Sequence, residues 1–182
     1  MASAATVHFD NVAAAMLGGF VLVSRQPRPV ALKPPRDLEV AVAIPNIELP
    51  KKKTKAMRDI LPQRVPLPDV TGNMFHAALF ISGILQSDIA MMGEAMKDLI
   101  VEPVRSKSIP MFQSVKRAAI DAGAAGVAIS GAGPSLVALC DRTLTNTKDV
   151  AKAMSDGFGE GGIACEHYAT KPSSGARILK EM

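Results

Sequence analysis

Apolar residues recur along this chain with two different spacings, and the changes between them divide it into strands and helices. Short apolar runs bounded by Gly, Pro or Asp predict buried strands, whereas apolar residues three or four positions apart predict helices. The predicted strands are 20–23, 38–44, 125–130, 135–140 and 163–170. The predicted helices are 12–17, 52–60, 88–98, 111–122, 147–157 and one that opens at Asp69.

Glycine and proline mark the boundaries of the first elements. Gly18 and Gly19 stop the first helix, and Asp10 is placed to cap its start. Four prolines between Pro27 and Pro35 predict a connecting loop.

From residue 38 onward the predicted order is strand, helices, strand, strand, helix, strand. This is the split β-α-β arrangement of ferredoxin-like domains, with an elaborated first helical connection. The sequence therefore predicts an α+β fold for the larger part of the chain.

A glycine turn separates two of the predicted strands, in the sequence Ile-Ser-Gly-Ala-Gly-Pro-Ser-Leu over residues 129–136. Gly131 and Gly133 permit backbone conformations closed to other residues and let another group approach the peptide closely. Such a turn can present N–H groups to an anion, or it can simply join the strands of a hairpin. Taken alone, the turn fits the hairpin better.

Composition narrows the possible functions. The chain has 182 residues, 48% of them hydrophobic and 21% charged, which is ordinary for a globular protein with one substantial domain. Its net charge of +4 comes largely from the basic stretch 51–58, without the interleaved aromatic residues of single-strand nucleic-acid binders. That stretch is either a solvated helix start or a cationic patch that attracts a nucleotide or phosphate.

Cysteine, histidine and hydropathy patterns argue against several other classes. Two cysteines and three scattered histidines predict neither a disulfide framework nor a metal site. The longest apolar run, 12–23, is about half of what a bilayer requires, so we expect no membrane partner. No targeting segment is visible.

Several short segments occur together in one order along the chain. They are His-Phe-Asp-Asn-Val-Ala-Ala at 8–14, Leu-Gly-Gly-Phe at 17–20, Thr-Lys-Ala-Met-Arg at 54–58, Glu-Pro-Val-Arg at 102–105, and the glycine turn. Together these segments resemble the C-terminal half of homoserine kinases, in the galactokinase, homoserine kinase, mevalonate kinase and phosphomevalonate kinase (GHMP) superfamily. The resemblance runs from His8 to about Arg177. Ala14 departs from it, because the family usually has proline there.

The resemblance implies a function and a domain organisation. Homoserine kinases transfer phosphate from ATP, with Mg²⁺, to the hydroxyl of L-homoserine in threonine biosynthesis. The expected partners are therefore homoserine and ATP, with a homodimer for the complete enzyme and a cytoplasmic location, or a plastid in a plant. The expected division is a remnant of the N-terminal kinase domain over 1–30 and a GHMP-type C-terminal domain over 31–182.

Two arginines and a threonine are the candidate carboxylate-binding residues. Thr54 and Arg58 are four positions apart and share a face of the predicted helix, so Arg58 can grip a carboxylate while Thr54 donates a hydrogen bond. Arg105 is a second candidate. The alternative is a routine exposed helix for the first pair and a helix-end salt bridge of little energetic value for Arg105. The resemblance places both arginines at the substrate site.

The resemblance also places His8, Asp10 and Asn11 near the substrate. An amide cannot act as a base, so Asn11 would position the attacking hydroxyl rather than deprotonate it. Asp10 has the helix cap as its alternative role, and His8 a local hydrogen bond. The loop that the resemblance assigns to the active-site cleft comprises Ser130, Gly131, Ala132, Gly133 and Ser135.

The sequence lacks the parts of the family that bind phosphate and metal. No Gly-x-Gly-Ser-Ser loop and no Gly-x-x-x-x-Gly-Lys motif occurs in the 182 residues, and the magnesium glutamate of the family has no counterpart. We therefore expect a truncated homoserine kinase that does not transfer phosphate alone. Two alternatives remain, a non-catalytic amino-acid-binding module and a GHMP kinase for another small hydroxylated substrate.

Overall fold

The computed structural model describes residues 9–23, 28–48 and 53–179, and it divides into two compact units. The larger unit comprises 35–171, and the smaller comprises the residues up to Pro34 with those from Pro172 onward. The C-terminal residues thus group with the N-terminal segment. The division into 1–30 and 31–182 suggested by the resemblance stays a prediction.

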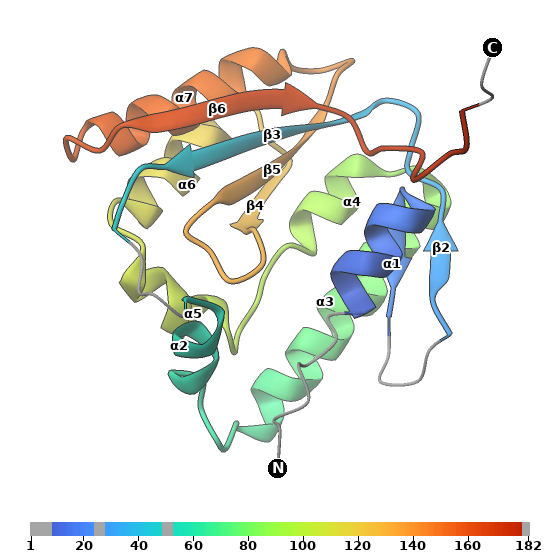
Figure 1. Ribbon diagram of the computed structural model, residues 1–182, viewed down its shortest axis with the longest axis horizontal. Coiled ribbons are helices and arrows are strands. Elements are labelled where there is room, and N and C mark those ends of the chain that lie inside the picture. The colour runs from blue at the N-terminus through green and yellow to red at the C-terminus, as the bar shows by residue number, and fades with distance from the viewer. Residues whose placement is uncertain (1–8, 24–27, 49–52, 180–182) are drawn as a thin grey trace. The chain divides into compact units, whose positions relative to one another are not determined.

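An antiparallel sheet of four strands organises the larger unit (Figure 1). Its order is β4-β5-β3-β6, and β3 pairs with both β5 and β6 while β4 pairs with β5. If β3, β4, β5 and β6 are numbered 1 to 4, the order read from the β6 edge is 4-1-3-2. This is the strand order of a ferredoxin-like sheet. The predicted fold class is confirmed. The strands are β3 (Leu38–Pro45), β4 (Gly126–Ile129), β5 (Leu136–Asp141) and β6 (Cys165–Thr170).

The hydrophobic core lies between this sheet and two helices, α6 (Phe112–Asp121) and α7 (Thr147–Gly159). Small residues of the sheet, such as Ala41 and Ala138, meet larger ones of the helices, such as Val115 and Phe158, and all four are inaccessible to solvent. The core is aliphatic with few aromatic residues.

The remaining helices of the larger unit lie in the long connection between β3 and β4 (Figure 1). They are α2 (Lys53–Asp59), α3 (Leu67–Gln86), α4 (Ile89–Glu94) and α5 (Glu102–Arg105), followed by the 3-10 turn η1 (Ser106–Ser108). Gly93 and Gly126 bring α4 and β4 into direct contact, since a Cβ atom on Gly93 would lie 2.1 Å from the carbonyl oxygen of Ala125. None of the described helices is long and apolar enough to cross a membrane.

The smaller unit contains α1 (Phe9–Leu17) and a hairpin of β1 (Phe20–Leu22) with β2 (Val30–Leu32). The N–H of Gly19 donates to Ser173 and the N–H of Ala176 donates to Met16, which ties the C-terminal residues to α1. Gly18 has a φ of +68°, and a Cβ atom there would lie 2.2 Å from the Gly175 nitrogen, so the close approach requires glycine.

Three sequence predictions differ from the structure. Asp10 lies in the first turn of α1 and not at its cap, where it still faces the positive end of the helix dipole. The helix expected over 88–98 ends at Glu94, because Asp98 bonds to the start of the next helix. The proline-rich loop contains β2, a strand too short for its pattern to stand out.

Candidate functional site

Arg105 joins three parts of the larger unit that are far apart in the sequence. It is the last residue of α5 and is half-buried. Its Nε donates to the carbonyl oxygen of Met57 in α2 at 3.3 Å, and its Nη1 donates to the carbonyl oxygen of Gly131 in the glycine turn at 2.9 Å. The structure therefore brings together the arginine of Glu-Pro-Val-Arg, the helix of Thr-Lys-Ala-Met-Arg and the glycine turn.

Thr54 and Arg58 lie on α2, one on each side of the residue that Arg105 contacts. Both side chains are exposed. Arg58 directly follows Met57, so its Cα atom is one peptide, about 3.8 Å, from the residue whose carbonyl Arg105 holds. The predicted helix is present, and its substrate-facing role stays a prediction.

The structure pairs neither arginine with a carboxylate in the part of the chain that it describes. Within the described residues, no ion pair involves Arg58 or Arg105, whereas Arg142 pairs with Asp37 and Lys152 with Asp156. The described residues therefore show no helix-end salt bridge at Arg105. Among the described residues, the side-chain bonds of Arg105 go to neutral carbonyl groups, which do not offset the charge of a guanidinium. Two such cations in adjoining elements favour an anionic ligand.

The glycine turn is a closed hairpin connection with two left-handed residues. The N–H of Ser130 donates to Ser135 at 2.8 Å, and the N–H of Gly133 donates back to Ser130 at 3.0 Å. Gly131 and Gly133 have φ values of +58° and +77°, and the Gly133-Pro134 peptide is cis. The hairpin interpretation is correct. Because Gly131 also accepts the bond from Arg105, the hairpin is at the same time part of the candidate site.

Asp98 and Asn73 hold the start of α5, and the sequence analysis did not single them out. Asp98 Oδ1 accepts from the N–H groups of Ile100 and Val101 at 2.8 and 2.9 Å and from Asn73 Nδ2 at 3.0 Å. Partial burial by itself raises the pKa of Asp98, but the bonds from Val101, Asn73, Ile100 and Glu102 outweigh it and leave that pKa below its ordinary value of 3.8. The usable signal was an aspartate shortly before Glu-Pro, because Asp side chains often accept from N–H groups two or three residues further on.

Glu102, the first residue of α5, also helps to hold this helix in place. Its side chain forms an ion pair with Lys116 of α6 and is only 16% exposed. Lys116 also lies over the ring of Phe112, 5.5 Å from its centroid. Glu102 thus connects α5 to the helices of the core.

Asp10 and Asn11 lie on α1, in the smaller unit, and both are exposed. His8 lies outside the described residues. The role proposed for these three side chains stays a prediction.

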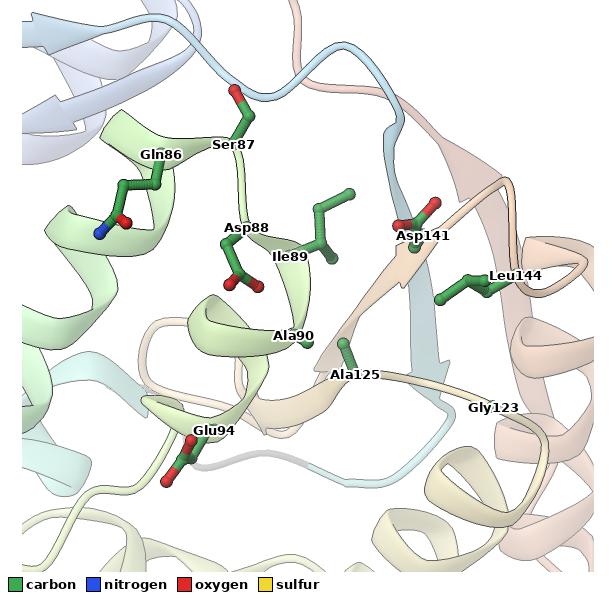
Figure 2. A pocket seen from close by; sticks show the side chains of 10 residues that line it. All are labelled: Gln86, Ser87, Asp88, Ile89, Ala90, Glu94, Gly123, Ala125, Asp141 and Leu144. Carbon is green, nitrogen blue, oxygen red and sulfur yellow. The ribbon is translucent and has the colours of Figure 1, made fainter.

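A pocket of about 570 Å³ lies elsewhere in the larger unit (Figure 2). Figure 2 shows its acidic side chains, which are Asp88 just before α4, Glu94 at the end of α4 and Asp141 at the end of β5. Asp88 caps α4 by accepting from Met91, and Asp141 accepts from Thr143, so both carboxylates have structural roles. None of the predicted substrate-binding residues lines this pocket.

The described residues contain no group of three or more His, Cys, Asp or Glu side chains that could hold a metal ion.

Comparison with known proteins shows which proteins the chain resembles. Residues 80–162 match the family model described as GHMP kinases C terminal. This part of the chain is therefore similar to the C-terminal domain of GHMP kinases. The homoserine kinase from Cytophaga hutchinsonii is a solved structure of similar fold, with a TM-score of 0.84 and 36% identity over 92% of this chain and 53% of that one. A mevalonate kinase from L. major, 18% identical with a TM-score of 0.62 over 89% of this chain and 52% of that one, shows likeness of fold alone.

Curated homoserine kinases align with nearly the whole chain. The one from Methanocella arvoryzae is 40% identical over 181 residues, 98% of this chain and 57% of that protein. The one from Pyrococcus abyssi is 38% identical over 97% of this chain and 58% of that protein. The chain thus spans a little over half the length of the curated relatives it matches. The resemblance to homoserine kinases is confirmed.

The matched part of the GHMP kinase C-terminal domain contains Asp98, Arg105 and the glycine turn. The helix with Thr54 and Arg58 lies before it. That helix is included in the longer similarity to homoserine kinases, which covers nearly all of the chain. The family model therefore covers Arg105 but not α2, whereas the alignment with homoserine kinases covers both.

Proposed function

We propose that this chain supplies the substrate-binding portion of an ATP-dependent homoserine kinase. The observation that carries the proposal is the position of Arg105, which is bonded to the main chain of α2 and of the glycine turn. Arg105 has no ion pair within the described residues and bonds the residue before Arg58, and the relatives that align with the chain are homoserine kinases.

The two arginines and Thr54 bind the carboxylate of homoserine in this proposal. A guanidinium presents N–H groups in a plane that matches a carboxylate, and pairs of this kind give both affinity and orientation. Arg105 uses Nε and Nη1 to hold the protein, which leaves Nη2 for the ligand. Arg58 and Thr54 are exposed on α2 and complete the anchor.

Asn11 positions the hydroxyl that attacks the γ-phosphate, with Asp10 and His8 as further contacts to the amino acid. Phosphoryl transfer depends mainly on positioning and on positive charge at the transferred group, so an amide that orients the hydroxyl is sufficient without a protein base. ATP, when bound, supplies the phosphoryl group. The product would be O-phosphohomoserine, on the route to threonine.

Calorimetry tests the anchor on the 182-residue chain itself. We expect L-homoserine to bind, and Arg58→Ala or Arg105→Ala to weaken binding by about ten- to a hundredfold, since a lost bond to a charged group costs about 1.5–3 kcal/mol. Arg142→Ala is the matched control. Its side chain pairs with Asp37, so its removal should change the dissociation constant less than about twofold.

Phosphoryl transfer is tested in a fusion with the part of the Methanocella arvoryzae homoserine kinase that the chain does not cover. We expect ADP formation that depends on L-homoserine, lost together with binding in the Arg105→Ala variant. A folded fusion that turns over R-mevalonate or galactose but not homoserine would refute the substrate. Homoserine binding without any turnover of the fusion would instead favour an amino-acid-binding module.

A further inference from the structure

We infer that Asp98 and Asn73 are positioning residues for Arg105, so that a partly buried hydrogen-bond network at the start of α5 sets the geometry of the carboxylate anchor. The functional part of this inference rests on the proposed homoserine kinase activity. Neither residue is among the predicted site residues, and neither side chain contacts Arg105 directly.

The network begins with the Asp98 carboxylate. Oδ1 accepts from Asn73 Nδ2, Ile100 N and Val101 N, while Oδ2 accepts from Glu102 N at 3.2 Å. Four donors thus fix both oxygens of one carboxylate.

Asn73 locks the same segment from α3. Its Oδ1 accepts from the N–H of Leu99 at 2.8 Å, while its amide nitrogen donates to Asp98. Asn73 therefore uses both ends of its amide group and ties residues 98 and 99 to a helix of 20 residues. This contact spans 25 positions of sequence and gives α5 an anchor outside itself.

The network reaches Arg105 through the main chain. Val101, held by Asp98, accepts at its carbonyl oxygen from the N–H of Val104 at 3.1 Å and of Arg105 at 2.9 Å. With only four residues, α5 is too short to be stable by itself, because nucleation of a helical turn is unfavourable. The backbone position of Arg105 therefore depends on the bonds that Asp98 accepts at the other end of the turn.

The two hydrogen bonds of the Arg105 side chain require its backbone to lie in one position. It must reach the Met57 oxygen and the Gly131 oxygen at once, in two different elements. A displacement of about 1 Å in a positioning group is enough to cost a reaction two orders of magnitude. If the backbone at the start of α5 becomes more mobile, at least one of these two bonds should break. The Nη2 group would then no longer have one fixed orientation.

A purely structural cap would stabilise the fold without affecting Arg105, so the test must observe Arg105 itself. NMR of the chain with ¹⁵N-labelled arginine reports the Nε–H of Arg105, assigned by its loss in the Arg105→Lys variant. We expect Asp98→Asn to speed exchange of this proton with water by about tenfold, because its hydrogen bond to Met57 is weakened. Asn73→Ala leaves the Asp98 carboxylate intact and should speed the exchange of the Arg105 proton by a smaller factor. This variant replaces Asp98→Asn in the test if Asp98→Asn does not fold.

Asp59→Asn is the matched control. It removes an exposed carboxylate from α2, where Asp59 pairs with Lys55, and should leave the Arg105 signal unchanged. Unchanged exchange at Arg105 in both network variants would overturn the inference, whatever their melting temperatures.

Homoserine binding gives a second readout through a double-mutant cycle. We expect Asp98→Asn to weaken binding about tenfold in the parent chain and to have no further effect in the Arg105→Ala background. Equal weakening in both backgrounds would show that Asp98 does not act through Arg105. If the parent chain binds no homoserine, the proposed function fails, while the exchange of the Arg105 proton still decides the positioning role.

Discussion

Replacement of Asp98 by asparagine should destabilise the chain in a way that depends on pH. The variant keeps the shape of the side chain and one acceptor oxygen, but it removes the charge and places an NH₂ group at one of the four donors. Hydrogen bonds to a charged acceptor contribute about 1.5–3 kcal/mol, so we expect a loss of about 2 kcal/mol in the free energy of unfolding at pH 7.

The sign of the pH dependence follows from the lowered pKa of Asp98. A carboxyl group whose pKa is lower in the folded than in the unfolded state stabilises the fold above its ordinary pKa, here 3.8. That contribution is lost as the pH falls through the folded-state value, where both states bind the proton. The difference between parent and variant should therefore be constant near neutral pH and shrink below 3.8.

Urea denaturation followed by circular dichroism measures this difference, since the chain has no tryptophan for fluorescence. Asp59→Asn is the control, because its exposed pair with Lys55 contributes at most about 0.5 kcal/mol at any pH. The reasoning is refuted if Asp98→Asn costs the same at pH 7 and pH 3, or if its cost at pH 7 does not exceed that of the control.

Two further predictions concern packing and thiol chemistry. Gly93→Ala should lower the free energy of unfolding by at least about 1–3 kcal/mol in urea denaturation, because the new Cβ meets the Ala125 backbone, whereas Gly159→Ala has open space and should be neutral or slightly stabilising. Equal effects would contradict the close contact of α4 with β4. Burial raises the pKa of both thiols, and Cys140 is also inaccessible, so in the native chain Ellman's reagent should label Cys165 slowly and Cys140 only on unfolding. Rapid labelling of both thiols at pH 7 would contradict this.

The sequence predicts the sheet and its helices because their signals are local. The edges of β3, β4 and β5 fall within two residues of the predicted strands, where glycine, proline or aspartate interrupts the apolar run. The strand β2 was missed, since three residues among prolines show no periodicity. Asp98 was assigned to the end of the preceding helix because helical spacing alone does not show where α4 stops.

The candidate site is predictable only in part. Thr54, Arg58, Arg105 and the glycine turn were found through their resemblance to homoserine kinases, and the structure joins their elements. Asn73 was not found, because its partners lie 25 and 26 positions away in a segment without regular spacing. Contacts of this range depend on how α3 and α5 meet, which no local pattern specifies.

The way in which Arg105 is held has an evolutionary consequence. Both of its partners among the described residues are main-chain oxygens, at positions 57 and 131, and every amino acid supplies such an oxygen. Side chains at position 57 can therefore change across lineages without a compensating change at 105, and position 131 is restricted only by its left-handed backbone. Covariation analysis would find no coupled pair at this junction, although the three elements meet there. The contact is conserved with the backbone path and not with the side chains at positions 57 and 131, so it produces no paired substitutions.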